Sequence, residues 1–469
     1  MSTTPFQLRA SSAVTIFSRR AAALSAFSAL SIAAAACAPS VQLTTTPSAD
    51  AARAGAEPRL RADVAYLADD ALEGRGTGTP GNDSSAAFIS RRYAELGLRS
   101  PLAGQASACE GADRGSACAA SFIQSFEAWG AADAHAGRPP RPTQNVVAMI
   151  PGRDPALQGQ VVVIGAHFDH LGRSTEGALD PQAGDAIRNG ADDNASGTAA
   201  VMELARRFAA NPARRSILLV NFSGEELGLL GSAAFVEKSP VPVDSMQAML
   251  NFDMVGRLRD DKLIVYGIGT AEPLEAVLES ANSAPSLALS LVPDGYGPSD
   301  HSSFYAQGVP VLHFFTDVHD EYHRATDDAD LVNYAGMVRV VDFTERVARD
   351  LGDRPDRLQV VRSEQPAPVA GGYQQGSGRA AYFGSVPDMG AGDGKGLRLS
   401  GVTPGSPADR AGIRTGDVVV KFGDADVTDL YNYTDALRSH QPGDVVPVVV
   451  LRGGERLTMQ VTLTARGDS

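Results

Sequence analysis

The sequence is poor in positive charge. Its 41 lysine and arginine residues are outnumbered by 55 aspartate and glutamate residues, which gives a formal net charge of -14 at pH 7. Lysine is rare, and no basic patch stands out along the chain. This charge balance argues against nucleic acids and against anionic membrane surfaces as partners, because both repel an acidic protein.

Cysteine is also scarce, with three residues in the whole chain. Cys109 and Cys118 lie in the short polar stretch SACEGADRGSAC, and no histidine lies near them, which argues against a metal site there. In an oxidising compartment we expect these two cysteines to form a local disulfide. Two free thiols in a loop are the alternative.

The N-terminus has the pattern of an export signal. Arg19 and Arg20 precede the apolar run AAALSAFSALSIAAAA, residues 21–36. This run is short for a membrane span and ends in small residues, which is typical of a signal peptide. We therefore expect residues 1–37 to direct export and the protein to be extracytoplasmic, either periplasmic or secreted.

Cys37 ends the apolar run within the stretch AAAC, where it resembles the lipidated cysteine of bacterial lipoproteins. Ala34 stands where that signal usually has leucine. A lipid-anchored form and a form without lipid are therefore both compatible with the sequence. Contact with a membrane is expected only through this anchor.

The chain has 469 residues, a length that suggests more than one domain. Residues 38–56 have the composition of a flexible tether. Strand and helix patterns then fill residues 57–352. A stretch rich in Pro, Gly, Gln and Ser marks a linker at 353–378, and residues 379–466 predict a small β-rich domain.

Strand and helix patterns alternate within residues 57–352. The continuous apolar run VVVIGAHF, residues 161–168, is typical of a strand that is covered on both faces. A helical pattern, SGTAAVMELARRFA, follows it, and the next strand is SILLVNF at 216–222. The alternation predicts an α/β fold, a three-layer sandwich with a mostly parallel mixed sheet.

Polar side chains follow several of these predicted strands. His167 and Asp169 lie two residues apart at the end of a strand, so both can face the crevice where open α/β sheets bind ligands. His167 could bind a metal while Asp169 holds its other ring nitrogen. Asp253 follows another strand in LNFDMVG, and His323 lies in the polar loop HDEYHRATDDAD.

Glu225 and Glu226 follow the strand at 216–222 and are expected to open a helix. Neighbouring helical residues point roughly 100° apart, so one carboxylate can face a metal while the other faces a bound water. Acidic residues in the first turn of a helix also suit its dipole, which is the simpler explanation.

The stretch IRNGADDNASGTAA, residues 187–200, places Asp192 and Asp193 side by side among small residues. One carboxylate that projects from such a stretch could lie between two divalent ions about 3.5–4 Å apart. Each ion would then need one histidine and one further carboxylate. His167 with Asp253, and His323 with Glu226, meet this need and leave Glu225 free to act as a base.

The segments HFD, GADDNASG, GEELGLLGS, NFDM and YHRATDD, in this order, closely resemble the co-catalytic zinc aminopeptidases. These are the bacterial leucyl-aminopeptidase-like enzymes, in a superfamily with glutamate carboxypeptidase, glutaminyl cyclase and the transferrin receptor ectodomain. The resemblance covers roughly residues 57–352. It implies an exported aminopeptidase that holds two zinc ions per chain and hydrolyses N-terminal residues from peptides with a zinc-activated water.

The resemblance also implies roles for single residues. Asp193 would bridge the two metals, and the family often has a cis peptide bond after this position. Glu225 would be the general base. Asp169 would support the first metal histidine. Tyr322 is either a hydrogen-bond donor to the oxyanion or a packed loop tyrosine. The implied metal ligands are His167, Asp193, Glu226, Asp253 and His323.

The C-terminal part resembles the PDZ domains of bacterial exported proteases, most specifically in GSPADRAGIRTGDVVV. The segment AAYFGSV, residues 380–386, resembles the loop that receives a peptide carboxylate, and its Gly384 would let backbone N–H groups approach the anion. The peptide itself would add as a strand to a sheet edge. A domain that only docks on its neighbour is the alternative. The residues of the implied loop are Tyr382, Phe383, Gly384 and Ser385.

Other functions stay open at this point. A carboxypeptidase or a glutaminyl cyclase could share the fold, although the complete set of ligands for two metals favours hydrolysis over cyclisation. A protein with an inactive peptidase fold could act as a non-catalytic peptide-binding protein through its PDZ domain. The intact ligand set argues against that possibility.

Overall fold

The computed structural model of the chain contains a larger domain and a smaller C-terminal domain. The expected signal peptide, most of the tether, Cys109 and residues 363–378 lie outside the described part of the chain. Within the described part, no helix is both long enough and apolar enough to span a membrane. The described residues are 53–102, 116–128, 139–175, 177–283, 285–362, 381–387, 396–402, 405–427, 433, 436–437 and 440–465.

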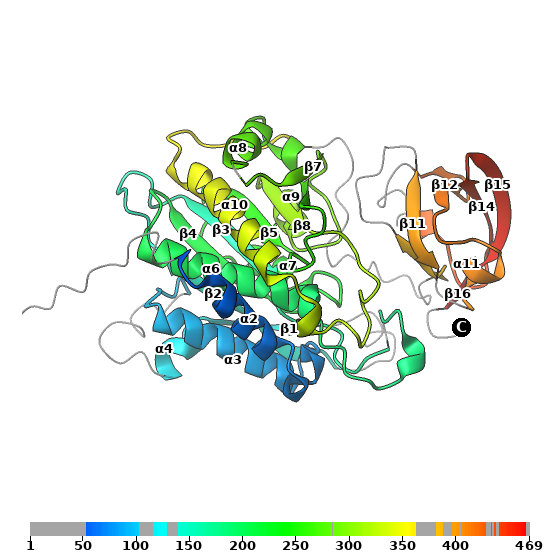
Figure 1. Cartoon of the computed structure of the whole chain (residues 1–469), viewed down its shortest axis with the longest axis horizontal. Coiled ribbons are helices and arrows are strands. Elements are labelled where there is room, and N and C mark those ends of the chain that lie inside the picture. Colours follow the sequence, from blue (N-terminus) through cyan, green and yellow to red (C-terminus); the bar gives the residue numbers. More distant parts are fainter. Residues whose placement is uncertain are drawn as a thin grey trace, which may run out of the picture. The chain divides into compact units, whose positions relative to one another are not determined.

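The larger domain is built on an eight-stranded sheet with the order β1-β2-β4-β3-β5-β8-β6-β7 (Figure 1). The central strands β4, β3, β5 and β8 run parallel to their neighbours in this group, while β1, β2 and β6 introduce antiparallel pairs. The predicted mostly parallel mixed sheet is thus confirmed. The strands are β1 (Ile123–Ala128), β2 (Arg141–Ile150), β3 (Val161–His167), β4 (Ser216–Phe222), β5 (Met246–Phe252), β6 (Lys262–Tyr266), β7 (Ala288–Val292) and β8 (Val311–Phe315).

Helices cover both faces of the sheet. Val162 and Ile164 of β3 point into the core shared with one helical layer, and Val161 and Val163 point into the core shared with the other. Both faces of β3 are buried, which explains its continuous apolar run. One layer holds α2 (Ala56–Leu67), α3 (Pro80–Glu95), α6 (Gly197–Ala210), α8 (Leu274–Ala281) and α10 (Tyr334–Asp353), and the other holds α7 (Leu230–Glu237) and α9 (His301–Ala306).

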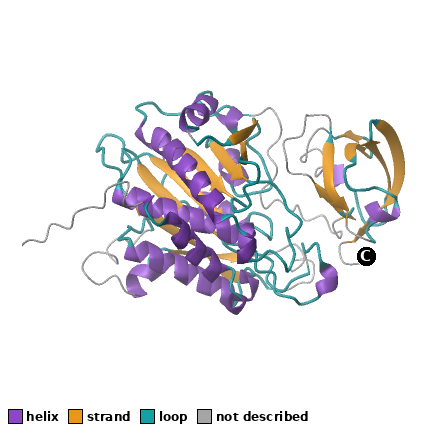
Figure 2. Ribbon diagram, viewed as in Figure 1, coloured by secondary structure: helices purple, strands orange, loops and turns teal. Residues whose placement is uncertain are grey.

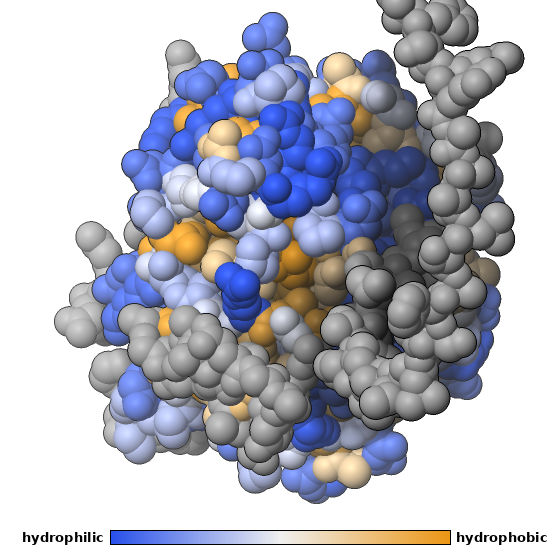
Figure 3. Space-filling view, turned by 90° about the vertical axis from the view of Figure 1, so that its left-hand side faces the viewer, coloured by the Kyte–Doolittle hydropathy of each residue, from blue (hydrophilic) through white to orange (hydrophobic). Residues whose placement is uncertain are grey.

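Among the coloured residues in Figure 3, hydrophilic ones predominate, and apolar residues form a smaller patch between them. The large aliphatic side chains of the strands are buried instead, as a three-layer sandwich requires. The predicted three-layer architecture is therefore confirmed.

The helix that follows β4 is shorter than the sequence predicts. Glu225 and Glu226 were expected to open it, but α7 begins only at Leu230. The backbone at Gly224, Gly228 and Leu229 has φ values of 73°, 110° and 61°, which a right-handed helix excludes. The expectation that Glu225 and Glu226 lie on a helix is therefore wrong, and both belong to a tight loop at the end of β4.

The C-terminal domain contains mostly short antiparallel strands, as expected (Figure 2). The aromatic rings of Phe383, Phe422 and Tyr433 pack against one another in its core. A short helix, α11 (Pro407–Arg410), lies between two of the strands in the sequence. The strands are β9 (Ala381–Tyr382), β10 (Ser385–Pro387), β11 (Leu397–Val402), β12 (Val418–Phe422), β13 (Ala425–Asp426), β14 (Val445–Arg452), β15 (Glu455–Thr462) and β16 (Thr464–Ala465).

Residues 354–361 pack against the larger domain, although their composition predicted a linker. The N–H of Leu358 donates to the side-chain oxygen of Gln247 at 3.2 Å, and the N–H of Val361 donates to the carbonyl of Thr270 at 2.7 Å. The side chain of Leu358 is buried in the core. A truncation that spares these contacts would therefore end after Arg362.

One short helix carries a cysteine of the expected disulfide. Cys118 lies on α4 (Ser116–Ala120), its side chain is buried, and it is disulfide-bonded. Its expected partner, Cys109, lies outside the described residues.

The buried strands supply most of the stability of the larger domain, so a cavity in β4 should be costly. Leu219→Ala removes a side chain with 0% exposure, and we expect the free energy of unfolding to fall by about 2–5 kcal/mol. Val361→Ala is the matched control, because its side chain is 50% exposed and the change should cost less than about 0.5 kcal/mol. Urea denaturation of both variants measures the difference, and equal losses would contradict this description of the core.

Candidate metal centre

The polar residues singled out in the sequence lie at one edge of the sheet. Because β3, β4, β5 and β8 are parallel, their carboxyl ends meet at this edge. His167 ends β3, Asp253 follows β5, and Glu225 and Glu226 follow β4. The loop after β8 supplies His323. The fold thus gathers side chains from distant parts of the sequence at the edge where α/β sheets bind ligands.

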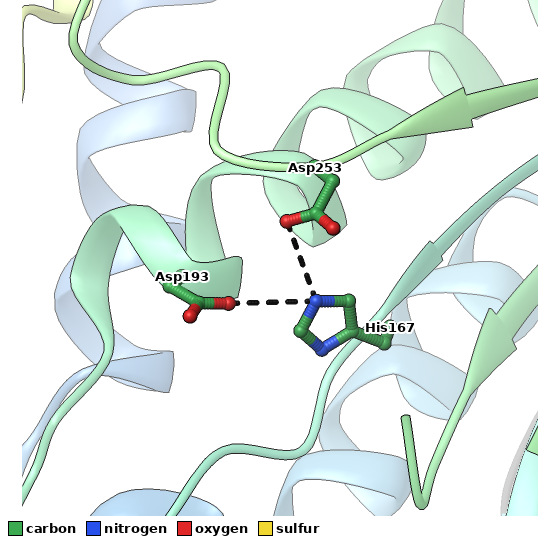
Figure 4. A group of neighbouring side chains, drawn as sticks. All are labelled: His167, Asp193 and Asp253. Carbon is green, nitrogen blue, oxygen red and sulfur yellow. Dashed lines mark hydrogen bonds and ion pairs between the residues drawn. The ribbon is translucent and has the colours of Figure 1, made fainter. Parts of the chain in front are cut away.

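A first group of donors forms around the ring of His167 (Figure 4). Its Nε2 lies 3.4 Å from Oδ1 of Asp193 and 3.4 Å from Oδ1 of Asp253. One ligand atom from each of these three residues lies within 4.8 Å of the others, a spacing that could hold a metal ion. The sequence had paired His167 with Asp253 around a bridging aspartate, and the structure brings these residues together.

A second group of donors faces the other oxygen of Asp193. Nε2 of His323 lies 3.1 Å from Oδ2 of Asp193 and 3.3 Å from Oε2 of Glu226. The two oxygens of the Asp193 carboxylate therefore face two separate groups. This is the arrangement that the sequence predicted for a bridging carboxylate, and the ligand roles themselves stay a prediction.

Both histidines are oriented by a second hydrogen bond. Nδ1 of His323 lies 2.9 Å from the carbonyl oxygen of Gly177, and Nδ1 of His167 lies 3.2 Å from the carbonyl oxygen of Asp169. A carbonyl only accepts hydrogen bonds, so Nδ1 is a donor in each ring. Nε2 faces the carboxylates and is therefore the nitrogen through which each ring could bind a metal.

His170 also lies at the second group of donors. Its Nδ1 is 2.7 Å from Oε1 of Glu226 and 3.7 Å from Oδ2 of Asp193, and its side chain is buried. His170, Asp193 and Glu226 form a second trio that could hold a metal. The only sequence signal was its place three residues after His167, which is weak on its own.

The doubled aspartate divides two tasks between its members. Oδ1 of Asp192 accepts hydrogen bonds from the backbone N–H of Gly256 at 2.6 Å and from the hydroxyl of Ser196 at 2.9 Å, so it fastens the loop. Asp193 is left to face the two donor groups. The peptide bond between Asp193 and Asn194 is cis, as the resemblance implied.

The small neighbours of this pair are required by close packing. Gly190 has a φ of 55°, and a Cβ there would lie 2.1 Å from the carbonyl oxygen of Asp193 and 2.5 Å from the ring of His170. Asp327 holds the same loop from the other side, because its Oδ2 accepts the N–H groups of Asp192 at 2.9 Å and Asp193 at 3.1 Å. Asp327 belongs to the YHRATDD stretch, although its role was not predicted.

Arg75 is a buried cation behind this loop that the sequence did not indicate. Its side chain is fully buried and donates to the carbonyl oxygens of Phe168 at 2.8 Å and Gly190 at 2.9 Å, as well as to those of Leu67 and Asn189. It thereby ties the end of β3 to the Asp193 loop. Burial lowers the pKa of Arg75 to about 10, and the charges of nearby carboxylates oppose that shift.

Glu225 and Asp169 are linked at the rim of the site. The backbone N–H of Glu225 donates to Oδ1 of Asp169 at 3.2 Å, and the hydroxyl of Thr77 donates to Oδ2 of Asp169 at 2.7 Å. Oδ1 of Asp169 is also 3.8 Å from Nδ1 of His167, within ion-pair distance. Asp169 therefore contacts both the predicted base and the predicted metal histidine.

Crowded carboxylates dominate the electrostatics of the centre. Burial raises the pKa of Glu225 well above its ordinary value, and Glu226 adds to the shift while His167 opposes it. Burial disfavours the charged form of His167, yet Asp253 and Glu225 raise its pKa well above the ordinary value. Although burial opposes it, His167 lowers the pKa of Asp253 to about 2. So many acidic groups in one crevice favour a bound cation.

The donor chemistry fits zinc. The two groups offer imidazole nitrogens and carboxylate oxygens, the mixture that zinc accepts, and both histidines are oriented by a second hydrogen bond. Cobalt and manganese are compatible with the same donors. The residues present thus fit the metal that the resemblance implied.

Tyr322 lies against the second group. Its ring stacks on that of His323 with 3.9 Å between the ring centroids and 26° between the planes. Burial, followed by Asp193 and Glu226, raises the pKa of Tyr322 well above its ordinary value, so the hydroxyl keeps its proton. A proton donor and a packed tyrosine both match this position, and its role stays a prediction.

The predicted carboxylate loop lies between β9 and β10 of the C-terminal domain. Tyr382 ends β9, Phe383 is buried in the core, and Ser385 begins β10 with its hydroxyl 2.5 Å from that of Tyr433. Gly384 has a φ of 86°, and a Cβ there would lie 2.1 Å from the Cβ of Ser406. Packing alone therefore requires this glycine, and peptide binding by the loop stays a prediction.

The chain is similar to two protein families and to several curated proteins. The model of peptidase family M28 matches residues 145–348, and that of the PDZ domain matches residues 383–463. A probable leucine aminopeptidase of Arthroderma otae is 29% identical over 208 residues, which is 41% of this chain and 53% of the relative. Leucine aminopeptidase 1 of Trichophyton rubrum is 29% identical over 230 residues, or 44% and 58%. The chain thus spans about half the length of the curated relatives it matches.

The chain is also similar to solved structures. LapA aminopeptidase of Legionella pneumophila has a TM-score of 0.48 and 20% identity, and the match covers 66% of this chain and 74% of that one. A zinc aminopeptidase from Bacillus subtilis has a TM-score of 0.47 and 16% identity, over 64% and 95% of the two chains.

The division of tasks between Asp192 and Asp193 leads to a test of metal content. Asp193→Ala should remove at least one metal ion per chain, because this carboxylate faces both donor groups. Asp192→Asn is the control, since an amide oxygen can still accept from Gly256 and Ser196, and it should retain the metal. Inductively coupled plasma mass spectrometry of the purified proteins compares them. Metal loss in the Asp192 variant alone would show that the bridging residue had been assigned to the wrong aspartate.

Proposed function

We propose that the protein is an exported aminopeptidase that removes N-terminal residues from peptides and holds two zinc ions. Residues 145–348 match the model of peptidase family M28, and residues 383–463 match that of the PDZ domain. The observation that carries this proposal is the position of Asp193, whose two oxygens face separate donor groups at 3.4 and 3.1 Å.

We assign the two metal positions from these groups. His167, Asp193 and Asp253 would hold one zinc ion, and Asp193, Glu226 and His323 would hold the other. When bound, zinc would act as a Lewis acid and lower the pKa of a bound water towards about 7. His170 contacts Glu226 and would keep that carboxylate in place.

The chain's own residues then handle the proton. The Glu225 carboxylate accepts a proton from the attacking water and delivers it to the nitrogen of the leaving amine. The hydrogen bond from the backbone of Glu225 to Asp169 fixes where the base lies. The Tyr322 hydroxyl, which keeps its proton, would donate to the oxyanion.

Two other functions are distinguishable from this one. A carboxypeptidase or glutaminyl cyclase of the same fold would act on other substrates, and the two donor groups around Asp193 favour hydrolysis with two metals. A non-catalytic peptide-binding protein would have no need of these groups. The decisive assay compares aminoacyl nitroanilides with their N-acetylated forms at a measured metal content. An aminopeptidase should cleave only the substrates with a free N-terminus.

We also propose that the protein works outside the cytoplasm. The signal-like sequence at 1–37 and the disulfide bond at Cys118 support export. Whether Cys37 carries a lipid decides between a membrane-anchored and a free protein. Cell fractionation with mass spectrometry of the mature N-terminus tests both points.

Substitution of Glu225 tests the proposed base. Glu225→Gln keeps the shape of the side chain and removes the proton acceptor, so turnover should fall by about 10²–10⁴-fold while the metal content stays the same. Activity assays and metal analysis on the same preparation give both values. Turnover like that of the wild type would show that another group accepts the proton, and loss of metal would make Glu225 a ligand instead.

Truncation of the PDZ domain tests whether it helps to bind long peptide substrates. If the loop at 382–385 holds the C-terminal carboxylate of a long peptide, the other end of that peptide is concentrated at the metals. Truncation after Arg362 should then raise the Michaelis constant for long peptides severalfold and leave aminoacyl nitroanilides nearly unchanged. Amidation of the C-terminus should have the same effect on the full chain. Equal constants for free and amidated peptides with both proteins would mean that the domain does not deliver substrate.

A further inference from the structure

A pocket of about 750 Å³ lies beside the metal centre. Its wall is formed by residues 257–259, by the loop at 318–326, and by Leu179, Leu331 and Asn333. This volume is in the range of pockets that hold small organic ligands, and it is large enough for a side chain or a peptide terminus.

The pocket adjoins the predicted metal ligands through two rings. Tyr322 lines it and stacks on His323 at 3.9 Å between centroids. His319 also lines it, and its Nε2 is 3.3 Å from Oδ2 of Asp192, the residue before Asp193. A ligand in the pocket would therefore lie next to the groups that act on the substrate.

The charges along the wall favour an anion. Glu321 is already engaged, because Arg257 donates to its carboxylate and His319 lies 3.1 Å from it. Asp320 is exposed to solvent. Arg259 donates to the backbone carbonyl of Val318 at 2.8 Å, and no carboxylate neutralises it among the residues described.

Arg324 is the cation that has no partner. Its side chain is partly buried, its Nε is buried without a hydrogen-bond partner, and no carboxylate of the described chain forms an ion pair with it. The positive charge of Arg324 is therefore not matched by a carboxylate of the described residues, and its terminal N–H groups are the donors that a ligand in the pocket could meet.

The backbone around Arg324 is fixed. Its N–H donates to the carbonyl of Glu321 at 3.0 Å, and its own carbonyl accepts the N–H of Asp327 at 3.2 Å. Asp327 in turn accepts the N–H groups of Asp192 and Asp193. Arg324 is thus tied through two hydrogen-bonded steps to the loop that carries the predicted bridging carboxylate.

We propose that this pocket binds a carboxylate of the peptide substrate and that Arg324 is its anchor. The planar guanidinium presents parallel N–H groups that match the two oxygens of a carboxylate. This inference rests on the proposed function and deepens it, because it makes anionic peptides the preferred substrate class.

The carboxylate has three possible sources, and three matched pairs of substrates distinguish them. Glutamyl and glutaminyl p-nitroanilide test the side chain of the first residue. Leu-Glu-amide and Leu-Gln-amide test the side chain of the second. Leu-Gly and Leu-Gly-amide test the terminal carboxylate of a dipeptide. The members of each pair have nearly the same shape and differ in one charge.

We expect one pair to favour its anionic member by about 10–100-fold in kcat/KM, the size of one charge-assisted hydrogen-bonded pair. Arg324→Gln should bring that ratio close to one, whereas Arg324→Lys should retain part of it because the charge remains. Since the readout is a ratio, a general loss of activity cancels. Arg339→Gln is the control, because Arg339 pairs with Asp261 away from the pocket and its variant should keep the wild-type ratio.

Two results would overturn the proposal: no pair favours its anion in the wild type, or Arg324→Gln leaves the preference unchanged. If the wild type cleaves none of the six compounds, the proposed function fails and the pocket is still testable. Calorimetric titration of the same compounds into the wild type and Arg324→Gln then decides. Selective loss of affinity for the anions would support the pocket, and equal affinities would overturn it.

Discussion

Repulsion among buried carboxylates is the constraint on which the metal centre depends. A carboxylate oxygen of Asp193 lies within 4.8 Å of one of Asp253 in the first donor group and of one of Glu226 in the second, and the N–H of Glu225 donates to Asp169. Acidic groups at this density would push the loops apart unless fixed donors hold the backbone. The hydroxyl of Thr77 donates to Asp169, and the Asp327 carboxylate accepts two backbone N–H groups of the Asp193 loop. The buried guanidinium of Arg75 donates to backbone carbonyls of both the end of β3 and the Asp193 loop. Bound zinc ions would further offset the repulsion among these carboxylates.

These hydrogen bonds involve a part of the chain that lies before the matched M28 segment, residues 145–348. Thr77 contacts Asp169, and Arg75 contacts the end of β3 and the Asp193 loop. The same region supplies α2 and α3, which pack in the core with the strands. The metal centre is therefore a product of the whole larger domain, and its N-terminal helices are more than a cover for the sheet.

The sequence predicted what depends on local pattern. Continuous apolar runs identified β3 and β4 because both strands are buried on both faces, and motifs identified residues that do meet at the sheet edge. β2 was missed, since its run RPTQNVVAMI begins with polar residues near the edge of the sheet. The loop that holds Glu225 and Glu226 was mistaken for helix because its acidic residues also suit a first helical turn. Only the positive φ values at Gly224, Gly228 and Leu229 distinguish the two.

The four acceptors around Arg75 are all backbone carbonyls, and this has a consequence for variation in the chain. A cation paired with a carboxylate depends on a second side chain, so one substitution at either position breaks the pair. A cation held by peptide carbonyls keeps its partners when the side chains of Leu67, Phe168 or Asn189 are exchanged for others that preserve the backbone path. The hydrogen bonds of Arg75 therefore do not depend on the identity of these three side chains, whereas the arginine itself has no compensating partner through which its loss could be repaired.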